Sequence, residues 1–196
     1  MYGQAVEEFR KPIIVNGTRV LRPKEWEALL VGCSKIDYKT MLEALLYTGM
    51  RYVEMQRFQE QPGLFDGNFI NLPQEIDRKK ERRQRGRWIR LNNQGKMAVR
   101  HFLSLKRKLP SYQSWNENLK CWCKRASLNP QGVTCKTTRK TLESWLMFYY
   151  PTQIALITLS QGHTTLTSMQ HYVNMPFTES DRIEIRNYVE GWVTNP

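Results

Sequence analysis

The sequence lacks the features that mark membrane, secreted and zinc-binding proteins. No stretch of about 18 apolar residues is present, and no secretory signal opens the chain. The four cysteines have neither C-x2-C spacing nor a neighbouring histidine set that would complete a zinc site. We therefore expect an intracellular protein with reduced thiols, no metal site and no membrane partner. The cysteines are Cys33, Cys121, Cys123 and Cys135.

Acidic side chains are scarce relative to basic ones. The 196 residues include 30 Lys and Arg but only 18 Asp and Glu, which gives a formal net charge of +12 at pH 7. A charge of this sign and size indicates a polyanionic partner, and nucleic acid is the commonest one. The alternative is a basic protein whose charge serves only solubility. Apolar residues make up 40% of the chain, so a folded domain with a sizeable core is expected.

The chain has no internal repeat and no low-complexity segment, and helical periodicity dominates it. Two alternating segments, 68–72 and 88–91, are typical of strands. Residues 1–22 are polar, with a turn signal at Asn16-Gly17, and are interpreted as an irregular N-terminal extension or linker. The sequence thus predicts a mainly α domain over residues 23–196 with one small antiparallel β-hairpin. Helices are expected at about 23–30, 38–47, 94–108, 112–126, 137–149, 152–160, 164–172 and 179–192.

Thr48-Gly49-Met50-Arg51 follows an apolar helical segment. Glycine at a helix end favours the left-handed conformation, which turns the chain sharply and holds Arg51 against the domain. Guanidinium groups bind the non-bridging oxygens of a phosphate bidentately, so Arg51 is a candidate phosphate ligand. The alternative is a capping arginine that pairs with Glu54 or Glu43.

A second basic pair, Lys136 and Arg139, stands three positions apart at the start of a predicted helix. This spacing places both residues on one helix face. The N-terminus of a helix already attracts anions, and two cations there would form a cradle for a phosphate group. The alternative is a basic first turn exposed to solvent.

His163 and Tyr172 complete the set of candidate catalytic residues. His163 follows Gly162 after an apolar helical segment and can donate to a phosphate oxygen or transfer a proton, although a lone histidine is more often structural. Tyr172 lies among polar residues, and a tyrosine can attack a phosphate and hold it covalently. Its phenol, with an ordinary pKa of about 10, needs nearby cations to ionise, which Arg51, Arg139 and His163 could supply.

The segment 78–90 has the densest positive charge in the chain, with eight Arg and Lys against Glu81 alone. Its flanking strands indicate a hairpin whose basic tip fits a DNA groove, with binding that weakens steeply as salt rises. The alternative is a solvated, disordered loop. The predicted DNA-binding residues are Arg78, Lys79, Arg82, Arg83, Arg85 and Arg87.

These residues together resemble the catalytic domain of the tyrosine recombinase (integrase) family, over roughly residues 23–192. Thr48-Gly49-Met50-Arg51 is similar to the family's first arginine box, with Glu54 at the usual acidic position. Lys136-Thr137-Thr138-Arg139 occupies the box that is usually His-x-x-Arg. His163 and Tyr172 match the last histidine and the nucleophile, including the nine-residue offset between them.

The chain also departs from the family pattern. The Lys-x-x-Arg form of the second box is similar to integrases of archaeal viruses and plasmids. The hairpin is longer and richer in arginine than usual, and both Lys79 and Lys80 are candidates for the family's catalytic lysine, with Lys80 slightly favoured. The family's N-terminal core-binding domain is absent from this sequence. The resemblance leaves open the target DNA sequence and whether cleavage occurs in cis or in trans.

The resemblance implies covalent phosphoryl transfer on double-stranded DNA without metal or cofactor. Tyr172 would form a 3′-phosphotyrosyl link and free a 5′-hydroxyl, while Arg51 and Arg139 stabilise the transition-state oxygens. His163 and Lys136 would support the phosphate or the nucleophile's proton, and Lys80 would protonate the leaving oxygen. Recombinases of this family exchange strands as tetramers on DNA, so self-association is expected.

Two other functions fit parts of the same pattern. Type IB topoisomerases use a similar set of residues but relax DNA as monomers. The amphipathic segment 179–192 could dock on a neighbouring protomer, which would favour a recombinase, or pack on its own core. A non-catalytic DNA-binding module is the third possibility, and the intact set of two arginines, a histidine and a tyrosine argues against it.

Overall fold

The computed structural model describes residues 11–76, 83–84, 86–162 and 175–193. Within these residues the chain is mainly helical with small antiparallel sheets, as the sequence predicted, but there are three two-stranded sheets where one hairpin was expected. The helices are α1 (Pro23–Gly32), α2 (Ile36–Thr48), α3 (Tyr52–Glu60), α4 (Asn93–Ser104), α5 (Tyr112–Arg125), α6 (Thr137–Tyr149), α7 (Ile154–Gln161) and α9 (Glu179–Val189). Single 3-10 turns lie at Pro62–Leu64 and Pro151–Gln153. The strands are β1 (Ile13–Val15), β2 (Thr18–Val20), β3 (Phe69–Leu72), β4 (Glu75–Ile76), β5 (Arg83–Gln84) and β6 (Arg87–Arg90).

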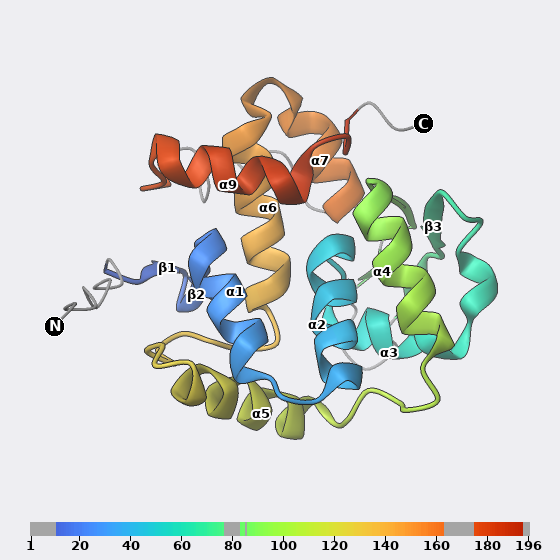
Figure 1. Cartoon of the computed structure of the whole chain (residues 1–196). Coiled ribbons are helices and arrows are strands. Elements are labelled where there is room, and N and C mark those ends of the chain that lie inside the picture. Colours follow the sequence, from blue (N-terminus) through green and yellow to red (C-terminus); the bar gives the residue numbers. More distant parts are fainter. Residues whose placement is uncertain (1–10, 77–82, 85, 163–174, 194–196) are drawn as a thin grey trace, which may run out of the picture.

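Helix α6 is the central element of the core. It runs through the middle of the molecule between α1 and α2 (Figure 1), and it also packs on β2, α7 and α9. Its apolar positions Leu142, Trp145 and Leu146 are buried, and the Trp145 indole donates a hydrogen bond of 2.9 Å to the Leu21 carbonyl. Because α6 is enclosed on several sides, a charged residue in its first turn is also drawn into the interior.

Residues 11–22 are more ordered than the sequence suggested. Residues 1–22 were expected to be irregular, but β1 and β2 form a hairpin whose turn places Asn16 and Gly17 at positive φ, as the turn signal there predicted. The hairpin is fixed because Arg19 is fully buried and its Nη2 lies 2.5 Å from Glu25 Oε1 in α1. Arginine is a polar residue that is expected at the surface, so the sequence did not indicate this buried contact. The proposed domain boundary at residue 23 stays a prediction.

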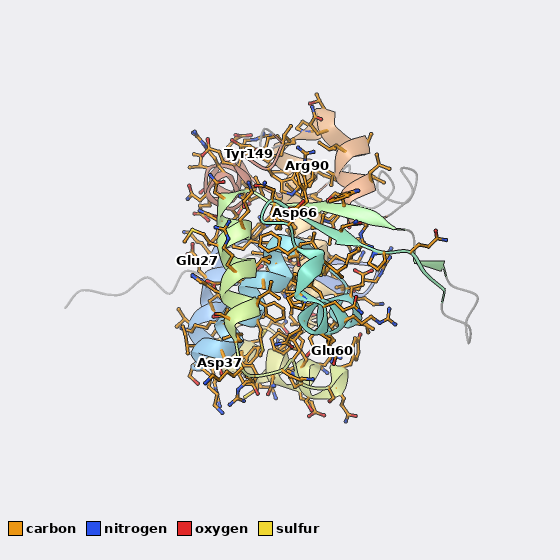
Figure 2. The ribbon with its side chains drawn as sticks, turned by 90° about the vertical axis from the view of Figure 1, so that its right-hand side faces the viewer. Glu27, Asp37, Glu60, Asp66, Arg90 and Tyr149 are labelled. Carbon is orange, nitrogen blue, oxygen red and sulfur yellow. The ribbon has the colours of Figure 1, made fainter. Side chains whose placement is uncertain are left out.

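The second and third sheets form one arm. Strands β3 and β6 pair with Leu72 opposite Arg87, which confirms both predicted strands, and β4 pairs with β5 farther along the same arm. Figure 2 shows this arm projecting from the helical body. Part of the basic segment, residues 77–82 and 85, lies outside the described residues.

Membrane-spanning helices and metal-binding clusters are both absent from the residues that the structure describes. None of the helices there has the length and apolar character needed to cross a membrane. In the same part of the chain, no three His, Cys, Asp or Glu side chains come together in a group that could hold a metal ion.

Candidate active site

Arg51 stands at the junction of α2 and α3, where the sequence predicted a sharp turn. Gly49 ends α2 in the left-handed conformation, with φ at 59°, and Arg51 is the N-cap residue of α3. A Cβ on Gly49 would lie 2.6 Å from the side-chain amide of Gln161, and the positive φ by itself favours glycine at this position. The Arg51 side chain is 48% exposed, which leaves its guanidinium accessible from solvent.

Glu54 is the acceptor around which the site is built. Its buried carboxylate accepts from the Arg51 amide at 2.8 Å and from Arg51 Nη1 at 2.7 Å. It also accepts from Arg87 Nη2 at 2.6 Å and Arg87 Nη1 at 3.2 Å, while Arg139 Nη1 lies 4.0 Å away. The pairing of Arg51 with Glu54 was the alternative interpretation of Arg51, and the structure shows that it exists in a cluster of three arginines.

The charge of this cluster governs the ionisation of Glu54. Burial alone raises the pKa of the Glu54 carboxyl, because a buried charge loses its hydration. The hydrogen bonds from Arg87 and the charges of Arg87, Arg139 and Arg51 outweigh burial and lower that pKa to about 2. The carboxylate is therefore ionised across the physiological pH range.

Arg139 reaches the same cluster from the first turn of α6. Its side chain is 7% exposed, and its Nη1 donates a hydrogen bond of 2.8 Å to the Gly49 carbonyl. Its Nη2 donates to the carbonyl of Gln161, the last residue of α7. Burial and then the neighbouring charge of Arg51 lower the pKa of Arg139 to about 10, so it remains a cation at neutral pH. Arg139 thus joins the end of α2 to the end of α7.

Lys136 lies differently from Arg139, although the sequence predicted that the two would share one face. It is the exposed N-cap residue of α6, and its amide donates to Thr134 Oγ1 at 3.2 Å. The Arg139 side chain instead turns inward to the backbone carbonyls of Gly49 and Gln161. The structure therefore replaces the predicted two-cation cradle with one surface lysine and one buried arginine.

Arg87 requires a correction. It was predicted to contact DNA, but its side chain is 4% exposed and its Nε donates to the Ser160 carbonyl at 3.1 Å. A guanidinium enclosed in this way, with Glu54 on its other edge, does not face a groove, and this burial argues against the predicted DNA contact. The sequence could have indicated this burial, because alternate residues of a strand face the same side and Arg87 alternates with the buried residues Ile89 and Leu91.

Several predicted residues lie outside the described part of the chain. Gly162 ends α7 in the left-handed conformation, with φ at 67°, and it directly precedes His163 in the sequence. The backbone of Arg83 belongs to β5. The predicted site residues that lie outside the described residues are Arg78, Lys79, Lys80, Arg82, Arg85, His163 and Tyr172.

The assembled cluster has more cationic than anionic groups. Three guanidinium groups meet at Glu54, and Glu143 offsets only part of the charge on Arg139. Arg51 is the member with substantial exposure to solvent. A surplus of fixed guanidinium groups with one accessible member is suited to an anion with several oxygens, such as a phosphodiester. Sequence reasoning placed Arg51 and Arg139 here but missed Arg87 and the backbone carbonyls that orient them.

Comparison with known proteins gives a fold but no close relative. No protein-family model matches the chain, and no curated protein matches it. The solved structure of the Tn1549 transposon integrase in complex with circular intermediate DNA is similar, with a TM-score of 0.60, 15% identity and 86% of this chain covered. The crystal structure of XerA recombinase is similar as well, with a TM-score of 0.58, 16% identity and 87% coverage.

The present chain spans 66% of the length of the integrase structure and 65% of that of XerA. Identities of 15% and 16% support a shared fold and do not by themselves transfer a function. The described helices and small sheets, together with these likenesses, show that the chain has the mainly helical fold of tyrosine recombinase catalytic domains.

Proposed function

We propose that this chain is the catalytic domain of a site-specific DNA recombinase or integrase that cleaves and rejoins strands through a 3′-phosphotyrosyl intermediate. One observation carries the proposal. Arg51 and Arg139, selected from the sequence as phosphate ligands, come from separate helices and meet at Glu54 within a recombinase fold. A shared fold alone would not require this convergence, and a surplus of arginines alone would not imply strand transfer.

In the proposed reaction, the phenolate oxygen of Tyr172 attacks the scissile phosphorus and forms the phosphotyrosyl ester. The bond between phosphorus and the 5′-oxygen breaks, and Lys80 of the hairpin gives that oxygen a proton. Arg51 and Arg139 stabilise the charge on the non-bridging oxygens, Arg51 from its exposed position and the buried Arg139 through its positive charge. His163 and Lys136 support the phosphate or the proton of Tyr172. Attack by a 5′-hydroxyl of another strand reverses the step, so no nucleotide is consumed.

The proposed substrate is double-stranded DNA. The net charge of +12 supports a polyanionic partner, and the integrase with the same fold is bound to circular intermediate DNA in its structure. The Lys-x-x-Arg box at Lys136 and Arg139 leads us to place the protein with archaeal virus or plasmid integrases, acting inside the host cell as a tetramer on DNA.

A covalent trapping experiment tests the function. The protein is incubated with a pool of nicked duplexes of randomised sequence, in EDTA, and adducts are resolved on a denaturing gel. We expect adducts in the wild type and none in Tyr172→Phe, with DNA binding nearly unchanged, because only the nucleophilic oxygen is lost. DNA binding without Tyr172-dependent adducts would contradict the enzyme and indicate a non-catalytic DNA-binding module. A requirement for magnesium would contradict the arginine-based mechanism.

The same assay decides between Lys79 and Lys80. A general acid contributes about 100- to 10,000-fold to rate, whereas losing one phosphate contact changes the salt dependence of binding by about one unit. We expect Lys80→Ala to lose cleavage on ordinary DNA and to regain it on DNA with a bridging 5′-phosphorothiolate, because sulfur leaves without protonation. Selective rescue of Lys79→Ala would reassign the acid, and rescue of neither would make Lys136 the next candidate.

A further inference from the structure

Arg87 makes a set of contacts that a DNA-binding or merely buried arginine does not need. Its Nη1 and Nη2 bind the two oxygens of Glu54 at 3.2 and 2.6 Å, and its Nε binds the Ser160 carbonyl at 3.1 Å. All three nitrogens of one guanidinium are therefore used within the protein. This fork orients the plane of the Glu54 carboxylate as well as neutralising it.

The carboxylate that Arg87 orients is also the partner of Arg51. The same two oxygens of Glu54 accept from the Arg51 side chain at 2.7 Å and from its amide at 2.8 Å. Since Arg51 is half exposed, solvent competes for its guanidinium, and the fixed carboxylate determines where that guanidinium points. Arg87 therefore acts on Arg51 through Glu54 without facing solvent itself.

Arg87 also lies at the base of the basic arm. It is the first residue of β6 and pairs with Leu72 of β3, and β4 and β5 continue the arm beyond that pair. On its other side, its Cδ would lie 2.9 Å from a Cβ placed on Gly162, so the backbone at the end of α7 approaches this side chain closely. One side chain thus contacts or adjoins α3, the end of α7 and the origin of the arm.

We infer that Arg87 is a positioning residue: it fixes Arg51 through Glu54 and holds the base of the DNA-binding arm in register with that arginine. The inference rests on the proposed function for its consequence in cleavage. Lysine cannot replace arginine here, because one ammonium group cannot span two carboxylate oxygens and the Ser160 carbonyl in the same geometry. The role therefore depends on the shape of the guanidinium in addition to its charge.

The test compares Arg87→Lys with Arg19→Lys. Arg19 is the matched control, since it is a buried arginine paired with Glu25 at 2.5 Å, and it lies in the N-terminal hairpin outside the cluster. Both variants keep the positive charge and lose a guanidinium fork, so both are expected to unfold at lower denaturant. Single-turnover adduct formation and DNA affinity are measured under conditions in which each variant is folded.

We expect Arg87→Lys to slow adduct formation by about 100-fold or more, the usual effect of misplacing a catalytic group by about an ångström. Its affinity for DNA should stay within about 3-fold of the wild-type value, because the buried Arg87 itself makes no phosphate contact. Arg19→Lys should cleave at the wild-type rate. Equal cleavage by the two variants would overturn the inference, and a parallel loss of affinity and cleavage in Arg87→Lys would make Arg87 a DNA contact instead.

A second measurement is independent of cleavage. The carboxyl carbon of Glu54 is followed by NMR as pH falls, in the wild type and in both variants. Arg87→Lys should raise the pH at which Glu54 takes up a proton, and Arg19→Lys should leave it unchanged, because Arg87 contacts Glu54 whereas Arg19 pairs with Glu25. If the wild type forms no adduct, the proposed function fails while this titration still decides whether Arg87 controls Glu54. An unchanged Glu54 titration in Arg87→Lys would overturn the inference.

Discussion

Two buried arginine–glutamate pairs occupy opposite roles in this molecule. Arg19 and Glu25 join the N-terminal hairpin to α1, and both side chains are 2% exposed. Arg87 and Glu54 are buried to a similar degree, at 4% and 3%, yet Glu54 also binds Arg51 and lies near Arg139. The first pair balances one charge against another, whereas the second leaves a surplus of positive charge that reaches solvent through Arg51. The same kind of ion pair thus serves packing in one place and, in the proposed function, anion binding in the other.

The largest expected effect would come from removing Arg51, the exposed arginine that binds Glu54. Arg51→Ala should reduce adduct formation by about 100- to 1,000-fold, the usual result of deleting one transition-state donor. Its effect on the free energy of unfolding should be below about 1 kcal/mol, because a half-exposed ion pair adds little stability. Single-turnover cleavage and denaturant unfolding measure the two quantities.

The control for that variant is Arg107→Ala, because Arg107 is 47% exposed and pairs with Asp37 at 3.1 Å, in a different part of the chain. It should cleave at the wild-type rate. If both variants lost cleavage equally, the positive charge at Arg51 would have no special role and the comparison would fail.

Neutralising each glutamate in turn is the direct test of the two pairs. Glu25→Gln and Glu54→Gln should each lower the free energy of unfolding by about 3 to 5 kcal/mol, because each leaves a buried arginine without its counter-charge. Only Glu54→Gln should also impair cleavage in the folded protein, since only it releases Arg51. Equal stability losses with cleavage lost in both variants would mean that cleavage simply follows folding.

Acid should act through Glu54. Its carboxyl has a pKa lowered from 4.5 to about 2, so its stabilising contribution is complete above about pH 4.5 and is lost as pH falls through about 2. A depression of that size corresponds to about 3 kcal/mol. Denaturant unfolding at successive pH values should show this loss in the wild type and a smaller acid dependence in Glu54→Gln. If the free energy of unfolding fell equally with pH in the two proteins, the acid sensitivity would come from groups other than Glu54.

The smallest expected effects concern two glycines with positive φ. Gly17 has φ at 70° and nothing within 4 Å of an added Cβ, so Gly17→Ala should cost about 1 kcal/mol of left-handed strain. Gly162 has φ at 67°, and its added Cβ would also meet Arg87 at 2.9 Å. Gly162→Ala should therefore destabilise the protein more and slow cleavage, as unfolding and adduct assays would show. Equal effects of the two substitutions would mean that the Arg87 side chain moves away from the added methyl group without affecting stability or cleavage.

Much of the fold followed from local patterns in the sequence. The apolar periodicity of α2 and α6, the alternation of β3 and β6 and the left-handed end at Gly49 all depend on residues close together in the chain. The prediction that the N-terminal segment is irregular was wrong for residues 13–20, which form a hairpin. Arg19 fixes this hairpin by binding Glu25 in α1, and its amide donates to the carbonyl of Gly132, which is distant in sequence. Local polarity carries no information about such partners.

The candidate site divides in the same way. The sequence by itself predicted the chemistry, because arginines after a helix-ending glycine and at the start of α6 are candidate phosphate ligands. Only the tertiary structure decided that Arg139 turns inward to the carbonyls of Gly49 and Gln161, and that Arg87 is buried on Glu54 instead of facing DNA. A buried cation is tolerated only where a counter-charge and acceptors meet it. Those partners lie at the end of α2, in α3 and in α7, so their meeting is a property of the packed core, which no single segment of the chain encodes.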